Sequence, residues 1–222
     1  MTIPQINIGD IVSSALSILG ENLPKWAIAI GEISTKILPH IEKVSIIAQA
    51  VASLIGILKP DSKVENIGIA TQEAEKKPAD FNSTKEYIEY LENEISSGRI
   101  NLNTTRTDGQ KIVNLAIGAT LVIKGIDEKY NLQTSPEFWN TIGMKSSEGK
   151  INASEVGCML ENAKKNNVDQ SDIAMYLNRS EITSGTQIAD ISKTIDSGFK
   201  EANPNLSDSD ISARFNELLK QN

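Results

Sequence analysis

The sequence predicts an all-α protein, and three observations indicate this fold class. Apolar residues recur at helical spacing through most of the 222 residues. Helix-starting residues such as Ser83, Ser135 and Ser207 stand directly before these periodic segments. Strand-like runs are scarce, since only residues 6–8 and 119–125 compete, and the second run lies inside a longer helical pattern. We therefore expect an N-terminal apolar helical bundle followed by a C-terminal array of short capped helices.

Three helices are expected in residues 1–60. The first covers 10–19, between the N-cap residue Asp10 and the terminating Gly20. Its apolar residues fall at helical spacing: Ile11, Val12, Ala15, Leu16 and Leu19. The second begins after Asn22 and stops or kinks near Pro39, and the third runs from about His40 to Leu58.

The stretch 44–58 contains fifteen residues without a charge. As a helix it spans about 22 Å, which is shorter than the roughly 30 Å hydrocarbon core of a bilayer. Gln49 interrupts it, and the charged pair Glu42-Lys43 directly precedes it. The sequence therefore predicts a buried helix, and leaves open whether its own chain, a second copy or another partner buries it.

A polar stretch at 61–82 is the best candidate for a boundary, because it contains Pro78 and loses strong periodicity after Ile69. Its pattern predicts a short helix or extended piece followed by a linker. We expect an apolar helical region at 1–60, a linker at 61–82 and a helical domain at 83–222. The domain at 83–222 either stands alone or forms one continuous domain with 1–60.

The C-terminal region shows repeated helix-start signals. Ser83 and Glu86 have the spacing of a capping box, in which each side chain bonds the other residue's backbone N–H. A strongly apolar helix is expected over about 108–129. Further helices are expected to start at Ser135, Ser154, Asp169, about Ser184 and Ser207.

Composition argues against several functions. The formal charge is −7, and residues 61–222 hold all of it. An acidic chain repels phosphate, so nucleic-acid binding is disfavoured, as is adsorption to anionic lipid by charge alone. With one histidine, His40, and one cysteine, Cys158, the chain has too few ligands for a usual zinc site. We predict no catalytic residue, no metal site and no cofactor.

One segment, 144–155, has part of the skeleton of an EF-hand loop. Gly149 holds the sixth position and Glu155 the twelfth, whereas Met144 replaces the usual Asp at the first. The favoured interpretation is a turn between two helices whose glycine serves geometry alone. Ion binding there is left open.

Tyr90 and Glu94 stand four residues apart in a predicted helix. This spacing resembles the Tyr-xxx-Asp/Glu signal of type VII secretion substrates. The Trp-x-Gly turn that accompanies that signal is absent from the sequence, so no functional residue is carried over.

These observations favour a non-enzymatic helical protein that binds a protein partner or assembles with itself. The alternative is a membrane-active protein, pore-forming or membrane-inserting, that uses the apolar helices of residues 10–58. A membrane is therefore the less favoured partner. The N-terminus lacks the basic start and apolar run of a signal peptide, so we expect a cytoplasmic protein and leave export without a cleaved signal open.

Overall fold

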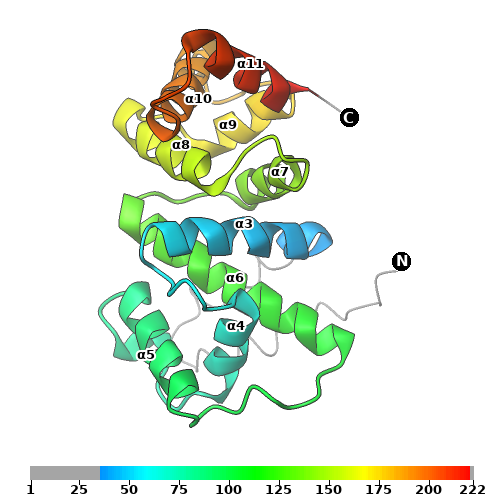
Figure 1. Ribbon diagram of the computed structural model, residues 1–222, viewed down its shortest axis with the longest axis vertical. Helices are drawn as coiled ribbons and strands as arrows, with labels where there is room; N and C mark the ends of the chain where they lie inside the picture. Colours follow the sequence, from blue (N-terminus) through cyan, green and yellow to red (C-terminus); the bar gives the residue numbers. More distant parts are fainter. Residues whose placement is uncertain (1–35, 221–222) are drawn as a thin grey trace.

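Two helices cross in the middle of the molecule and divide the other helices into two groups. The computed structural model describes residues 36–220. Figure 1 shows α3 (Ile41–Leu54) and α6 (Asp108–Tyr130) across the centre, with α4 and α5 on one side and α7 to α11 on the other. The bounds of the remaining helices are α4 (Val64–Glu73), α5 (Thr84–Ser96), α7 (Pro136–Ser147), α8 (Ala153–Asn166), α9 (Gln170–Leu177), α10 (Ile188–Ala202) and α11 (Asp208–Leu219).

Short 3₁₀ turns precede two of these helices. They cover Leu38–His40, directly before α3, and Pro78–Asp80, before α5. Among the described residues none lies in a strand, which confirms the predicted all-α fold class.

On one side of the centre, α4 packs closely on α6 through glycines. A Cβ added to Gly68 of α4 would lie 1.9 Å from the backbone oxygen of Asn114 in α6. A Cβ added to Gly118 of α6 would lie 2.0 Å from the backbone oxygen of Val64 in α4. Each glycine therefore lets one helix touch the backbone of the other.

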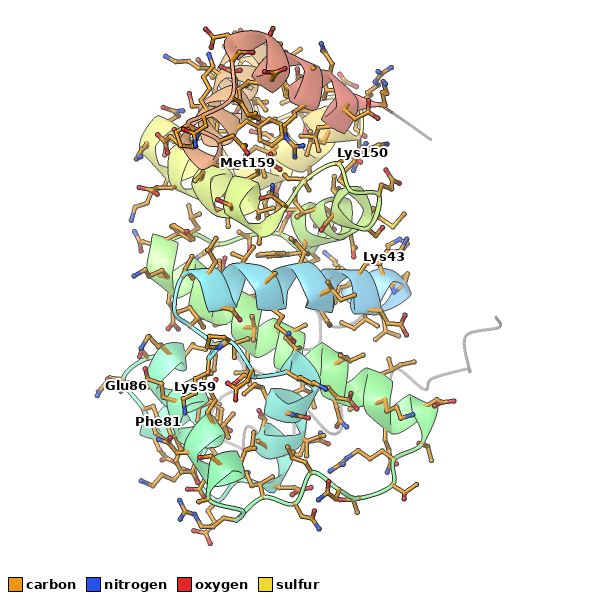
Figure 2. The ribbon with its side chains drawn as sticks, in the orientation of Figure 1. Lys43, Lys59, Phe81, Glu86, Lys150 and Met159 are labelled. Carbon is orange, nitrogen blue, oxygen red and sulfur yellow. The ribbon has the colours of Figure 1, made fainter. Side chains whose placement is uncertain are left out.

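A second close crossing joins α8 and α10. A Cβ on Gly198 of α10 would lie 2.8 Å from the backbone nitrogen and Cα of Met159 in α8, which Figure 2 labels. Ile195 and Phe199 of α10 are also fully buried. The C-terminal helices thus form a packed group, and α3 connects that group to α6.

Side chains hold the connection between α3 and α4 against α5. Figure 2 shows Lys59 next to α5, and its backbone N–H donates to the carboxylate of Glu92 in that helix at 2.9 Å. The Ser62 hydroxyl donates to the same carboxylate oxygen. The buried Glu92 therefore fixes this turn from the neighbouring helix.

The predicted capping box at the start of α5 forms only in part. Ser83 Oγ accepts a hydrogen bond from the Glu86 backbone N–H at 3.2 Å, as expected. The Glu86 carboxylate, labelled in Figure 2, accepts from the backbone and side chain of Asn82 instead of from Ser83.

Three predicted helix ends differ from those observed. The helix predicted over 40–58 ends at Leu54, because Gly56 takes a left-handed conformation and the Ile57 and Leu58 N–H groups close back on Ala52. Helix α8 begins one residue before the predicted Ser154, because Asn152 is its N-cap. Helix α10 begins at Ile188 instead of about Ser184.

The stretch 61–82, expected to hold a short helix or extended piece followed by a linker, includes the helix α4. Val64, Ile67 and Ala70 of this helix are buried in the core. The helix predicted at 10–19 lies outside the described residues. So does the part up to residue 35 of the helix predicted from after Asn22 to near Pro39. No helix in the part of the chain described here combines the length and apolarity needed to cross a membrane.

Candidate interaction surface

Helix α3 is buried on three sides by α6, α7 and α8. Val44, Ile47 and Val51 are at most 2% exposed. The uncharged stretch 44–58 is therefore largely covered by its own chain, which answers part of the question that the sequence leaves open.

The fourth side of α3 carries apolar side chains that face solvent. Ile46 is 69% exposed and Leu54 is 59% exposed, and Ala50 between them is also exposed. Residues four apart on a helix lie on the same face. These three residues, called the α3 stripe here, therefore form one line along the helix.

The α3 stripe differs from the other exposed apolar side chains among residues 36–220. Ile188 is 62% exposed at the start of α10, and Leu206 is 42% exposed between α10 and α11. Single exposed apolar side chains are common on protein surfaces, whereas larger contiguous apolar patches mark interaction sites. In Figure 1 α3 crosses the front of the molecule with no other helix drawn over it.

The residues around the α3 stripe are suited to receiving another helix. Ala50 has the smallest side chain of the three, so a second helix can approach α3 closely at its centre. The exposed Glu42 lies one turn before Ile46, and the half-buried Gln49 on the flank accepts a hydrogen bond from the Val64 backbone N–H at 3.0 Å. The stripe thus has polar borders on a helix whose other sides are buried.

The sequence has a single histidine, His40, which any triad of a nucleophile and a histidine base would have to use. His40 ends the 3₁₀ turn before α3 and lines a polar pocket with Lys145, Glu148 and Asn178. Cys158 is half-buried in α8. Burial is the main cause that raises the pKa of its thiol, and this disfavours the reactive thiolate.

The segment 144–155 forms the end of α7, a short turn and the start of α8. Gly149 has a φ of 72°, so the glycine serves the geometry of the turn. Glu155, the twelfth residue of the calcium-loop pattern, is fully buried and accepts two hydrogen bonds from Arg214 of α11, at 2.7 and 2.8 Å. Glu148 pairs with Lys150 at 2.8 Å. In this conformation both carboxylates that the pattern offers are bound to cations.

Glu155 also connects three parts of the C-terminal region. Its carboxylate accepts from the Asn152 backbone N–H at 2.9 Å and from Asn203 Nδ2 at 3.0 Å. With Arg214 these donors tie the start of α8 to the end of α10 and to α11. A buried carboxylate needs such partners, because an unpaired charge in the interior is strongly unfavourable.

Three cations bind the C-terminal end of α11. Lys145 and Lys150 donate to the carbonyl oxygen of Lys220 at 2.8 and 3.1 Å, and Arg179 donates to that of Leu219 at 3.4 Å. Cations stabilise the negative end of a helix dipole. Arg179 does so from a left-handed backbone conformation, with a φ of 55°.

Another buried carboxylate, that of Asp127, joins α6 to α7. Asp127 Oδ1 accepts from the backbone and hydroxyl of Thr134, and Thr134 Oγ1 accepts from the indole of Trp139 at 2.7 Å. Burial raises the pKa of Asp127 to about 6, although the bonds from Thr134 oppose this rise. The network explains why Trp139 can be fully buried with its N–H paired.

The export-like pair at Tyr90 and Glu94 is engaged within the domain. Tyr90 packs on Phe81 with ring centroids 5.2 Å apart, and Glu94 pairs with Arg99 at 2.6 Å. The ring contact of Tyr90 and the ion pair of Glu94 therefore give both residues a structural role on the surface of α5.

Comparison with known proteins gives no match. No family model, no curated protein and no solved structure matches the chain.

Sequence reasoning did not find the α3 stripe or the residues that bind Glu155 and the end of α11. The stripe has a signal in the sequence, because Ile46, Ala50 and Leu54 repeat at intervals of four. That signal does not separate the exposed line from the buried faces of an apolar helix. Arg214 lies 59 residues after Glu155, and no local pattern connects them.

Proposed function

We propose that this protein is a non-enzymatic helical protein that acts by protein–protein contact, and that the α3 stripe receives an apolar helix. The observation that supports this proposal is the line of Ile46, Ala50 and Leu54 on the exposed side of the central helix. An amphipathic helix laid in an apolar groove or on an apolar face is a common recognition mode, read as anchors three to four residues apart.

The size of the stripe favours a single helix over a second folded domain. A standard interface takes roughly 20–30 residues from each partner. The stripe supplies three apolar side chains along one helix, which is the footprint of one amphipathic helix. Residues 10–19 are expected from the sequence to form such a helix, so a neighbouring copy of this chain can supply the occupant as well as another protein.

The first experiment is light scattering on the full chain over a range of concentrations, together with binding of a labelled peptide that covers residues 8–21. We expect the protein to assemble or to bind the peptide. Replacing Ile46 and Leu54 with Gln should abolish both behaviours. The matched control is Ile188→Gln, which removes an equally exposed apolar side chain elsewhere and should leave both unchanged.

Two results would contradict the proposal. One is a monomer that does not bind the peptide and captures no helical partner. The other is assembly that the Ile46 and Leu54 substitutions leave as strong as in the wild type. Deletion of residues 1–20 separates the two sources of the helix, because assembly that depends on a neighbouring copy's segment 10–19 disappears in the deletion variant.

The membrane-active alternative uses residues 10–58, of which α3 is the described part. Membrane insertion of α3 would require Val44, Ile47 and Val51 to leave their contacts with α6, α7 and α8. This burial favours the protein-contact proposal. Liposome flotation with dye release tests the alternative, which predicts binding and leakage in a defined pH range.

A further inference from the structure

The apolar pattern of the α3 stripe occurs a second time in the sequence, in the segment 10–19. Both lines contain isoleucine, alanine and leucine at intervals of four residues: Ile46, Ala50 and Leu54 in the α3 stripe, and Ile11, Ala15 and Leu19 in the segment. No other isoleucine of the sequence is followed by alanine four residues later and by leucine eight residues later. Residues four apart share one face of a helix, so the helix expected at 10–19 presents the same line of side chains as the stripe.

The two lines fit one another when alanine meets alanine. Ala50 is the middle residue of the stripe, and Ala15 is the middle residue of the line in the segment. Packed helices lie about 8–10 Å apart, and small side chains at the crossing allow the shorter distance. The larger side chains on either side of Ala15 then cover Ile46 and Leu54, which are 69% and 59% exposed. This match holds for both directions of the segment, because alanine is central in each line.

The segment 10–19 is amphipathic around this line. At 3.6 residues per turn, further apolar residues flank the line on both sides: Val12, Leu16 and Ile18. The polar residues fall on the opposite side of the expected helix: Asp10, Ser13, Ser14 and Ser17. Docking of the segment on the stripe therefore buries no charge and leaves the hydroxyl groups in water.

The connection between the segment and α3 is long enough for the segment to reach the stripe of its own chain. Residues 20–35 lead to Lys36, whose carbonyl oxygen accepts from Asn140 Nδ2 of α7 at 2.9 Å. Ile46 follows Lys36 by ten residues in helical or 3₁₀ conformation, which is at most about 20 Å. Residues 20–35 span about 24 Å as a helix and about 50 Å when extended. The segment can therefore reach the whole stripe.

A segment of the same chain has an advantage over the segment of a neighbouring copy. Two groups joined by a short linker that spans the distance between them have an effective concentration in the millimolar range. A neighbouring copy presents its segment at the protein concentration, which is micromolar in a binding experiment. The segment of the same chain therefore occupies the stripe first.

We propose that the segment 10–19 occupies the α3 stripe of its own chain, with Ala15 against Ala50, and that a partner helix must displace it. This inference rests on the proposed function and adds the regulation of the same surface. Competition weakens the binding of a partner by the ratio of the effective concentration to the Kd of the segment. For an effective concentration of about 1 mM and a Kd of about 0.1 mM, the full chain should bind a helix roughly tenfold more weakly than a chain whose own segment cannot dock.

Binding of the labelled peptide 8–21 to variants of the full chain tests the competition. Ala15→Glu in the protein puts a charge at the centre of the apolar line, so the peptide should bind this variant about tenfold more tightly than the wild type. The matched control Ser13→Glu adds the same charge on the opposite side of the expected helix and should leave the affinity unchanged. Equal affinity for the wild type and Ala15→Glu would overturn the inference and leave the proposed function standing. A peptide that binds neither protein would overturn both.

Disulfide trapping tests which chain supplies the segment, and it does not depend on the peptide. The pair Ala15→Cys and Ala50→Cys, in a full chain that also carries Cys158→Ser, can form a disulfide when the two Cα atoms lie within about 7 Å. Mild oxidation at micromolar protein should give a cross-link within the monomer, identified by mass spectrometry of the digested protein. The pair Ser13→Cys and Ala50→Cys is the matched control and should cross-link much less. A disulfide-linked dimer, or no more cross-link than in the control, would overturn the inference.

Discussion

The close crossing of α4 and α6 predicts that the same change, glycine to alanine, has opposite effects at two positions of α6. Gly118→Ala places a methyl group 2.0 Å from the Val64 carbonyl oxygen and 2.9 Å from its carbon. These atoms belong to backbone and cannot rotate away, so the two helices must separate. Gly109→Ala, nine residues earlier in α6, meets only Thr107 Oγ1 at 3.9 Å.

The two substitutions are expected to change the free energy of unfolding in opposite directions. Alanine is favoured over glycine inside a helix by up to about 1 kcal/mol. Gly109→Ala should therefore raise the free energy of unfolding by about 0.5 kcal/mol. Overpacking typically costs about 1–3 kcal/mol, and the backbone clash at Gly118 belongs at the upper end. The net effect of Gly118→Ala should therefore be a loss of about 2 kcal/mol.

Urea denaturation followed by circular dichroism measures both changes, and thermal unfolding should show a loss of about 4–8 °C for Gly118→Ala. Gly68→Ala, which meets the Asn114 oxygen at 1.9 Å, should resemble Gly118→Ala. The double variant should cost less than the sum, because the first methyl group already separates the helices. A Gly118→Ala protein as stable as the wild type would refute the close crossing.

Three further predictions concern the buried charges and one strained residue. The pKa of the Asp127 carboxyl rises from 3.8 to about 6 on folding, because burial disfavours its charged form. The folded state therefore holds this proton more tightly, and wild-type stability should fall by about 2–3 kcal/mol as pH rises from 4 to 7. Asp127→Asn removes the carboxylate, so urea denaturation of the variant at the same pH values should lack this fall. Arg214→Met leaves the Glu155 carboxylate buried without its guanidinium partner and should lower the free energy of unfolding by about 3–5 kcal/mol, measured by urea denaturation. Adding Glu155→Gln to this variant should recover part of the loss. A double variant no more stable than Arg214→Met alone would contradict the pairing. Arg179→Gly relieves the left-handed backbone and should raise stability by about 0.5–1 kcal/mol in the same assay. An unchanged or lower stability would contradict the strain at this residue.

Helix starts were the part of the fold that sequence reasoning predicted best. Ser135, Asp169 and Ser207 each accept a hydrogen bond from the first turn of the expected helix. A capping residue acts on the next three residues, so its signal is local and readable. Ser184 shows the limit of that signal, because its hydroxyl binds the buried carboxylate of Asp172 and leaves α10 to begin four residues later.

The candidate sites depend on contacts that no local pattern records. Lys145 and Lys150 bind a carbonyl group at least 70 residues away, and a sequence alone presents them as ordinary charged residues. Likewise, the apolarity of α3 predicts burial for every face of the helix. Only the positions of α6, α7 and α8 determine that Ile46 and Leu54 stay outside.

The central position of α3 also has a consequence for synthesis on the ribosome. This helix is complete at residue 54, yet its last packing partner, α8, ends at residue 166. At roughly 5–20 residues per second, the ribosome needs about 5–20 s to supply the intervening chain. During that interval the apolar faces of α3 lack most of their eventual cover. Nascent chains of this protein should therefore depend on chaperones more than the stability of the finished fold suggests.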